Sequence, residues 1–364
     1  MLTWENSSQR DSMKAKYITT IFMLAILAML LTACGGAIPT NSIPGVSAAG
    51  DTAYLANAGE VYAIRLADGG LNWKYPAEKA EAGRYYYAAP VIAGNYLLAG
   101  DYLNSLHALS ANNGSQQWIY TQAGRFVASP LVVNDVIVAP NSNRSVYGFD
   151  LNGSLLWKFG STEPFWAQPV TDGTLAFVAG MDHYLYAIQP VDGSLVWKTD
   201  LEGAMAYPPA VGDGKVYQTT IASELIALNA ANGSIEWRFK ADSAIWMQPV
   251  LRDGILYFGD IQGNVYAVDE ATGTQKWKLP MEKEPLMGTP AVLENGLVFS
   301  SESGNIILVD YNGMKQWNRT IDGKLYSGVV LSGETLLVGV TKGKVALVAF
   351  DLNGNQKWVY PPQD

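Results

Sequence analysis

Cysteine and histidine are nearly absent from this sequence. Its 364 residues contain one Cys and two His. A single cysteine cannot form an intrachain disulfide, and structural zinc sites need several Cys or His ligands. The glycine-rich phosphate loop and the HExxH zinc motif are also missing. These absences argue against a disulfide scaffold and against a zinc protein.

The sequence is also poor in positively charged residues. The 24 Lys and Arg residues face 33 Asp and Glu residues, for a formal net charge of -9. An acidic chain without a basic stripe is a poor partner for phosphate backbones or anionic membrane surfaces. Nucleic acid is therefore excluded as a partner. The composition is 49% hydrophobic and 11% aromatic, which is enough for a large buried core.

A hydrophobic run long enough to remain in a bilayer is missing too. Residues 18–31 are apolar, but a permanent span needs about 20 residues. Lys14 and Lys16 precede this run, as in a secretory signal peptide. Met13 carries its own basic residues and is an alternative start. The pattern predicts export from the cytoplasm.

The apolar run ends in Leu-Thr-Ala-Cys, with Cys34 followed by two glycines. This segment resembles a bacterial lipobox, in which the cysteine is lipidated and becomes the mature N-terminus. The resemblance implies a signal peptide at 1–33, a lipidated tether at 34–43 and a folded domain at 44–364. Lipidation would also occupy Cys34, leaving no thiol nucleophile. Gly35, by similarity to enterobacterial sorting rules, favours the periplasmic face of the outer membrane; without an outer membrane, the expected place is the outer face of the cytoplasmic membrane.

Tryptophan is abundant and periodic. Eight of the 11 tryptophans recur at intervals of about 40 residues. They are Trp73, Trp118, Trp157, Trp197, Trp237, Trp277, Trp317 and Trp358. Each has a glycine four positions earlier, and that glycine mostly follows Asn or Asp. Asn-Gly and Asp-Gly between two apolar runs predict a hairpin turn.

Two further β-like runs precede each such hairpin, and the first of them usually begins at a proline, as at Pro249. Four short strands in about 40 residues, without a helical period, are typical of a propeller blade. Eight units fill residues 44–364, so we predict an all-β, eight-bladed propeller of four-stranded antiparallel blades. A small residue recurs in each third strand except at Leu308, which leaves room for a large ring. We therefore interpret the periodic tryptophans as structural docking residues between blades.

The repeat, written here as YAVDEATGTQKWK at 266–278, resembles the PQQ-type propeller repeat. One branch of that family comprises quinoprotein dehydrogenases, which bind pyrroloquinoline quinone and calcium. The other is the BamB-type lipoprotein of outer-membrane β-barrel assembly, an eight-bladed propeller without a cofactor. Lipobox, length and blade number match the second branch. The resemblance implies a monomeric propeller without enzymatic activity or cofactor.

Candidate chemistry is sparse. Carboxylates recur in the loops after the second strands and look like turn residues rather than Ca²⁺ ligands. These residues are Asp101, Asp182, Asp260 and Glu302. His107 falls in a predicted strand, and His183 follows Asp182 in a loop, where adjacent side chains point to opposite sides. We therefore predict neither catalytic nor cofactor-binding nor metal-binding residues.

A bulky pair precedes the proline that opens most blades. The pairs supply the aromatic rim of a candidate partner surface, or they line a packed channel. Arginines and acids in the same loops suit the polar edge of a protein interface. The candidate rim residues are Tyr87, Trp166, Trp246, Met287, Tyr326, Arg84 and Arg125. The insertion at 77–84 enlarges one of these loops.

Three functions stay open at this point. The first is a lipid-anchored, non-enzymatic scaffold that binds a protein in the cell envelope, in outer-membrane protein assembly where an outer membrane exists. The second is a quinone-dependent envelope dehydrogenase. The third is a surface module that binds carbohydrate or peptide. Fold alone does not choose among them.

Overall fold

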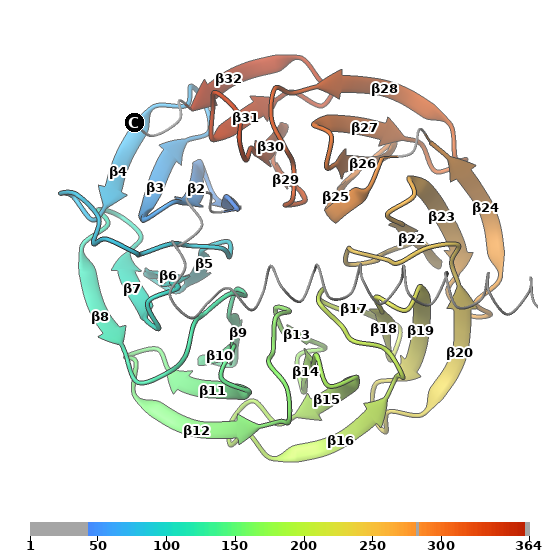
Figure 1. Cartoon of the computed structure of the whole chain (residues 1–364), viewed down its shortest axis with the longest axis horizontal. Coiled ribbons are helices and arrows are strands. Elements are labelled where there is room, and N and C mark those ends of the chain that lie inside the picture. The colour runs from blue at the N-terminus through green and yellow to red at the C-terminus, as the bar shows by residue number, and fades with distance from the viewer. Residues whose placement is uncertain (1–42, 282–283, 361–364) are drawn as a thin grey trace, which may run out of the picture. The chain divides into compact units, whose positions relative to one another are not determined.

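The structure is a computed structural model that describes residues 43–281 and 284–360. These residues form eight four-stranded antiparallel sheets arranged as blades around a ring (Figure 1). The predicted fold class, an eight-bladed propeller, is confirmed. Every secondary-structure element in this part of the chain is a strand. No described helix is long and apolar enough to cross a membrane.

Each blade takes its four strands consecutively from the chain, and its first strand lies nearest the centre (Figure 1). The strands of blades 1 to 4 are β1 (Gly45–Ala49), β2 (Thr52–Asn57), β3 (Glu60–Arg65), β4 (Leu71–Tyr75), β5 (Val91–Ala93), β6 (Tyr96–Gly100), β7 (Leu106–Ser110), β8 (Gln116–Tyr120), β9 (Leu131–Val133), β10 (Val136–Asn141), β11 (Ser145–Asp150), β12 (Leu155–Gly160), β13 (Val170–Thr171), β14 (Ala176–Ala179), β15 (Tyr184–Ile188) and β16 (Leu195–Asp200). The strands of blades 5 to 8 are β17 (Ala210–Gly212), β18 (Lys215–Thr219), β19 (Glu224–Asn229), β20 (Ile235–Lys240), β21 (Val250–Arg252), β22 (Ile255–Gly259), β23 (Asn264–Asp269), β24 (Gln275–Pro280), β25 (Leu286–Leu293), β26 (Gly296–Ser301), β27 (Asn305–Val309), β28 (Lys315–Thr320), β29 (Val329–Ser332), β30 (Thr335–Gly339), β31 (Leu347–Phe350) and β32 (Gln356–Tyr360).

The predicted Asn-Gly and Asp-Gly turns connect the third and fourth strands of the blades. Between β15 and β16, Gly193 has a φ of 71°, in the left-handed region that favours glycine. The Asp192 carboxylate accepts a hydrogen bond from the backbone N–H of Ser194 at 2.9 Å. The aspartate therefore stabilises the turn locally, as its side-chain chemistry predicts.

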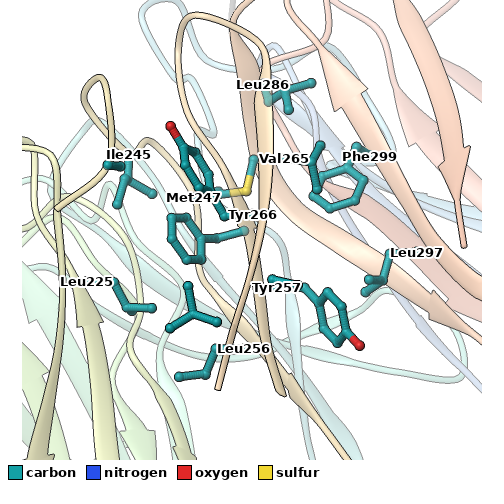
Figure 2. Packing of buried hydrophobic residues seen from close by; sticks show 14 of the residues in the cluster. Leu225, Ile245, Met247, Leu256, Tyr257, Val265, Tyr266, Leu286, Leu297 and Phe299 are labelled. Carbon is teal, nitrogen blue, oxygen red and sulfur yellow. The ribbon is translucent and has the colours of Figure 1, made fainter. Parts of the chain in front are cut away.

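The hydrophobic core lies between the blades, because each sheet buries both faces against its neighbours. One cluster contains Leu225 of blade 5, Leu256 and Tyr266 of blade 6 and Phe299 of blade 7. Figure 2 shows these side chains together. A single four-stranded sheet could not bury both faces, so the ring supplies the core.

The periodic tryptophans join each blade to the next. The indole N–H of Trp197 in β16 donates to the carbonyl of Ala230 in blade 5 at 2.9 Å. The indole ring lies against the turn glycine of blade 5, where a Cβ on Gly233 would be 2.5 Å from the ring. Ala187 is the cross-strand neighbour of Trp197, so the small residue leaves room for the ring within its own blade. Five tryptophans repeat this bond with the following blade: Trp73, Trp118, Trp157, Trp237 and Trp277.

The ring closes through the same contact. Trp358 of β32 donates to the Leu66 carbonyl of blade 1 at 2.8 Å. Its ring lies against Gly69, the turn glycine of blade 1. Because every blade is built from consecutive strands, neither chain end completes a sheet at the opposite end of the sequence. Among the described residues, no strand pairing joins blades 8 and 1, and side-chain docking holds them together.

Blade 7 departs from the pattern. The buried indole nitrogen of Trp317 has no hydrogen-bond acceptor within the described residues. Its cross-strand neighbour is Leu308, where the other blades have Ala or Gly. Arg319 instead donates to the backbone carbonyls of Gly354 and Asn353 in blade 8, at 2.8 and 2.9 Å. An arginine thus replaces the tryptophan hydrogen bond at this interface.

Candidate partner-binding face

One end of the ring gathers two sets of loops, which we call the loop face. These are the loops that enter the first strand of each blade and those between the second and third strands. Backbone hydrogen bonds join the two sets, for example from Met181 N to Pro164 O at 3.1 Å and from Ile221 N to Ala204 O at 3.1 Å. The candidate rim residues all belong to these entry loops or to their junctions with the first strands.

The first member of each bulky pair belongs to the core. Tyr86 and Phe165 have an exposed fraction of 0%, and Ile245 has 1%. Ile245 and Leu286 lie in the packed cluster of Figure 2. These side chains therefore pack between blades and not against a partner. They agree only in part with the alternative that the bulky pairs line a packed channel.

The second member is more exposed, and most so in blades 4 and 6. Trp166 and Trp246 have exposed fractions of 37% and 39%. The same repeat position in blade 5, the blade between them, holds the small residue Ala206. Ile221, at 41% exposure, lies in the neighbouring loop of blade 5. We call these four residues the aromatic saddle.

The remaining rim candidates behave differently. Met287 is only 6% exposed, because it belongs to the long strand β25 and pairs there with Ser300. It is therefore not available at the surface. Tyr326 is half-buried, and its hydroxyl donates to the Glu302 carboxylate at 3.3 Å. Tyr87 packs on Tyr102, with ring centroids 5.3 Å apart.

The two candidate arginines are held by neighbouring side chains. The guanidinium of Arg125 lies 4.1 Å from the centroid of the Tyr102 ring and donates to the Tyr102 hydroxyl at 2.8 Å. Arg84 is 13% exposed; it donates to Glu81 at 2.9 Å and lies 3.3 Å from Asp101. Carboxylates therefore neutralise the charge of Arg84, whereas Arg125 contacts an uncharged tyrosine.

Acidic residues surround the aromatic saddle. Glu163 and Glu202 are exposed, and neither forms an ion pair within the part of the chain that the structure describes. Asp242 pairs with Lys278 of β24. Tyr207 follows Ala206, and burial raises the pKa of its phenol to about 12, so it stays neutral. The saddle is thus an apolar patch with negative charge at its border.

A buried polar cluster in blade 2 was not predicted from the sequence. Asp101 and His107 both have 0% exposure, and His107 Nε2 lies 2.9 Å from the Asp101 carboxylate. Asp101 also accepts a hydrogen bond from Ser105 N at 2.8 Å, as expected of a turn residue. Since the pair is closed to solvent, it cross-links the loop to the strand rather than meeting a substrate. His183, in contrast, is exposed.

The other loop carboxylates also work locally. Asp260 accepts hydrogen bonds from the backbone N–H groups of Gln262 and Asn264, each at 2.9 Å, and from the Tyr266 hydroxyl at 2.9 Å. Asp182 accepts from the Tyr186 hydroxyl at 2.5 Å. No group of three His, Cys, Asp or Glu residues converges as a metal site in residues 43–281 and 284–360. Cys34, the predicted signal peptide and most of the predicted tether lie outside the described residues.

An eight-bladed ring with these docking tryptophans has the architecture of the quinoprotein-like propellers. The solved structure of BamB from Moraxella catarrhalis is similar, with a TM-score of 0.69 and 18% identity over 81% of this chain and 90% of that one. The computationally designed Ika8 protein is similar with a TM-score of 0.74 and 14% identity over 86% and 97%. A europium-containing methanol dehydrogenase has a TM-score of 0.69 and 14% identity over 86% and 85%. At these identities the likeness shows the fold alone.

The family comparison is more specific. The family described as outer membrane protein assembly factor BamB matches residues 57–164, 142–260 and 261–363. These matches cover most of the chain, so the chain belongs to this family. No curated protein matches it.

Proposed function

We propose that this chain is a non-enzymatic scaffold of the cell envelope, which binds a protein partner through the aromatic saddle of its loop face. Family membership supports an envelope role related to outer-membrane protein assembly. The observation that carries the proposal is the exposure of Trp166 and Trp246, at 37% and 39%. Large aromatic rings at the centre of a surface patch are the usual anchors of protein interfaces.

The docking contacts do not account for these two rings. The eight periodic tryptophans lie at the interfaces between blades, whereas Trp166 and Trp246 lie in loops two blades apart. The blade between them has the small residue Ala206 at the equivalent position. The border acids Glu163 and Glu202 favour a partner that carries Lys or Arg beside an apolar anchor.

The N-terminal pattern supplies the second half of the proposal. Lipid on Cys34 would hold the propeller at a membrane while the loop face binds its partner. In a cell with an outer membrane, this places the scaffold on the periplasmic face of that membrane. In a cell without one, the propeller would lie on the outer face of the cytoplasmic membrane.

Crosslinking and affinity capture from native membranes, followed by mass spectrometry, test the proposal. The native lipoprotein should recover a β-barrel assembly component in an organism with an outer membrane. The variant Trp166→Ala/Trp246→Ala should lose most of this recovery while its thermal unfolding stays close to that of the native protein. Val191→Ser, on a turn away from the loop face, serves as the matched control and should capture normally.

Two results would contradict the proposal. If the double variant captured the same partner with undiminished yield, the saddle would not be the binding surface. If quinone and Ca²⁺ added to the purified protein produced a bound chromophore and dye-linked dehydrogenase activity, the chain would be an enzyme.

A further inference from the structure

Most interfaces between blades contain a pair of aromatic rings near the loop face. One ring lies two residues after the docking tryptophan, and the other directly precedes the small residue of the next blade's third strand. Tyr120 of blade 2 and Tyr147 of blade 3, for example, have centroids 6.0 Å apart. The equivalent pairs are Tyr360 with Tyr62 at 5.3 Å, Tyr75 with His107 at 5.6 Å, Phe159 with Tyr186 at 5.3 Å and Phe239 with Tyr266 at 5.7 Å.

The interface between blades 7 and 8 has lost both rings. Arg319 and Val348 occupy the two positions. The Arg319 guanidinium turns toward the backbone of Asn353 and Gly354. Val348 has Val359 as its cross-strand neighbour, where the corresponding pair in blade 3 is Tyr147 and Lys158. In blade 8, two valine side chains therefore stand where blade 3 has the ring of Tyr147 and the long side chain of Lys158.

A cavity of about 320 Å³ lies in this interface. Its lining includes Ile321, Lys344, Val345, Val348, Phe350 and Val359. The interface between blades 6 and 7 has also lost its ring pair, to Leu279 and Ile307, but the cavity beside Ile307 measures only about 20 Å³. There Met281 and Leu286 line the remaining space. The large cavity thus lies beside Val348, at a position where the ring-paired interfaces have an aromatic ring.

We propose that this cavity binds an aromatic side chain, Phe or Tyr, of a partner polypeptide. Five of the nine residues that line it are apolar: Ile321, Val345, Val348, Phe350 and Val359. Its volume is at the lower end of the range of ligand pockets, about 300–1,000 Å³, so it suits one ring rather than a large cofactor. The sister interfaces show that this framework accepts a ring at this place. An aromatic side chain from outside would complete the missing pair.

The position of the cavity favours a polypeptide as the source of the ring. Asp322 and Lys344, which line it, lie in loop-face loops and are exposed. Neither forms an ion pair within the described part of the chain. They are therefore free to contact polar groups that flank an aromatic residue in a partner. The choice of a polypeptide rests on the proposed scaffold function; the affinity for an aromatic ring does not.

The test measures ligand binding to the full-length protein in detergent by saturation-transfer NMR. The probes are p-cresol and the capped pentapeptides Gly-Gly-Phe-Gly-Gly and Gly-Gly-Leu-Gly-Gly. We expect saturable binding of p-cresol and of the Phe peptide, and at least about tenfold weaker binding of the Leu peptide. Val348→Phe, which fills the cavity from its wall, should weaken both aromatic probes at least about tenfold.

Val359→Phe is a second way to fill the cavity. Because Val359 is 39% exposed, we expect this variant to fold as the native protein does. Val191→Phe is the matched control, because residue 191 is 69% exposed on a turn outside the cavity. The control should bind both aromatic probes as the native protein does. Equal losses in the control and in Val359→Phe would show that the rings bind the general surface, and would overturn the proposal.

The outcomes separate this proposal from the scaffold function. Binding of p-cresol without the Phe peptide would assign the cavity to free aromatic molecules and overturn the polypeptide. Binding of neither probe would overturn the site altogether. The variant Trp166→Ala/Trp246→Ala should still bind both probes. The capture experiment therefore tests the aromatic saddle, and the NMR experiment tests the cavity independently of it.

Discussion

The interfaces on the two sides of blade 8 differ sharply. Between blades 8 and 1, Trp358 donates to Leu66 at 2.8 Å, and Tyr360 packs against Tyr62. Between blades 7 and 8, the Trp317 nitrogen lacks an acceptor among the described residues, and a cavity lies beside Val348, where the ring-paired interfaces have an aromatic ring. The interface between blades 8 and 1 has both the tryptophan hydrogen bond and the ring pair, whereas the interface between blades 7 and 8 has neither.

Chain connectivity explains why the ring tolerates this difference. Blades 7 and 8 are joined by the peptide segment between β28 and β29, which keeps them close even if their side-chain contacts are weak. Blades 8 and 1 have no such segment and depend on side-chain docking. A cavity for a ligand is therefore least costly at an interface that the chain itself bridges.

Removing the closing tryptophan should have the largest effect. Trp358→Ala deletes a ring that is 8% exposed, together with its hydrogen bond, and should lower the free energy of unfolding by about 3–5 kcal/mol. Trp317→Ala should cost at least about 1 kcal/mol less, because its indole nitrogen has no acceptor among the described residues. Urea unfolding followed by tryptophan fluorescence and circular dichroism measures both. Equal losses would show that the two interfaces contribute alike.

The next effect concerns an ionic contact across an intact interface, between blades 5 and 6. Lys215 donates to the Glu270 carboxylate at 2.6 Å, and the Tyr217 hydroxyl donates to it as well. Burial disfavours the charged form of Glu270, but these hydrogen bonds outweigh it and hold its pKa below the ordinary value of 4.5. Glu270→Gln should lower the free energy of unfolding by about 1–3 kcal/mol at neutral pH.

The sign of the pH dependence follows from the lowered pKa. The stabilisation is fully present above the ordinary pKa of 4.5, and it is lost as the pH falls through the lower pKa of the folded state. The difference between native protein and Glu270→Gln should therefore shrink below that pH in thermal melts. Asp253→Asn, at a carboxylate that is 87% exposed, is the control and should leave the profile unchanged. A constant difference down to low pH would contradict this account.

Filling the cavity should stabilise the weak interface. Val348→Phe places a ring where the ring-paired interfaces have one, and should raise the free energy of unfolding by about 0.5–2 kcal/mol. Thermal unfolding against Val191→Phe, which adds a ring outside the cavity, isolates the contribution of filling. A loss of stability would mean that the walls between blades 7 and 8 cannot accommodate a ring.

The smallest stability effect is expected at the non-periodic tryptophans. Trp166→Ala and Trp246→Ala should each change the free energy of unfolding by less than about 1 kcal/mol, because each ring is more than a third exposed and neither is at a docking position. Trp197→Ala, at a docking position, provides the contrast in the same melts. A loss at Trp166 comparable to that at Trp197 would place the saddle rings in the core.

Local sequence predicted much of the fold, because every blade repeats the same turn and docking positions. The Gly193 turn and its aspartate follow from side-chain chemistry within a few residues. The candidate site was harder to predict. Adjacent residues such as Phe165 and Trp166 look alike in sequence, and only the packing of blade on blade buries the first and exposes the second. Met287 is buried because β25 extends further than the other first strands. The sequence of β25 does not predict this greater length.

The period of the tryptophans and glycines determined the blade, its turns and the number of repeats, since these depend on interactions within about 40 residues. Leu308 marked blade 7 as unusual even in the sequence. Tertiary structure alone decided that Trp317 loses its acceptor, that Asp101 meets His107 in the interior and that a cavity opens beside Val348. These outcomes depend on how side chains of different blades meet, and no local pattern encodes such contacts.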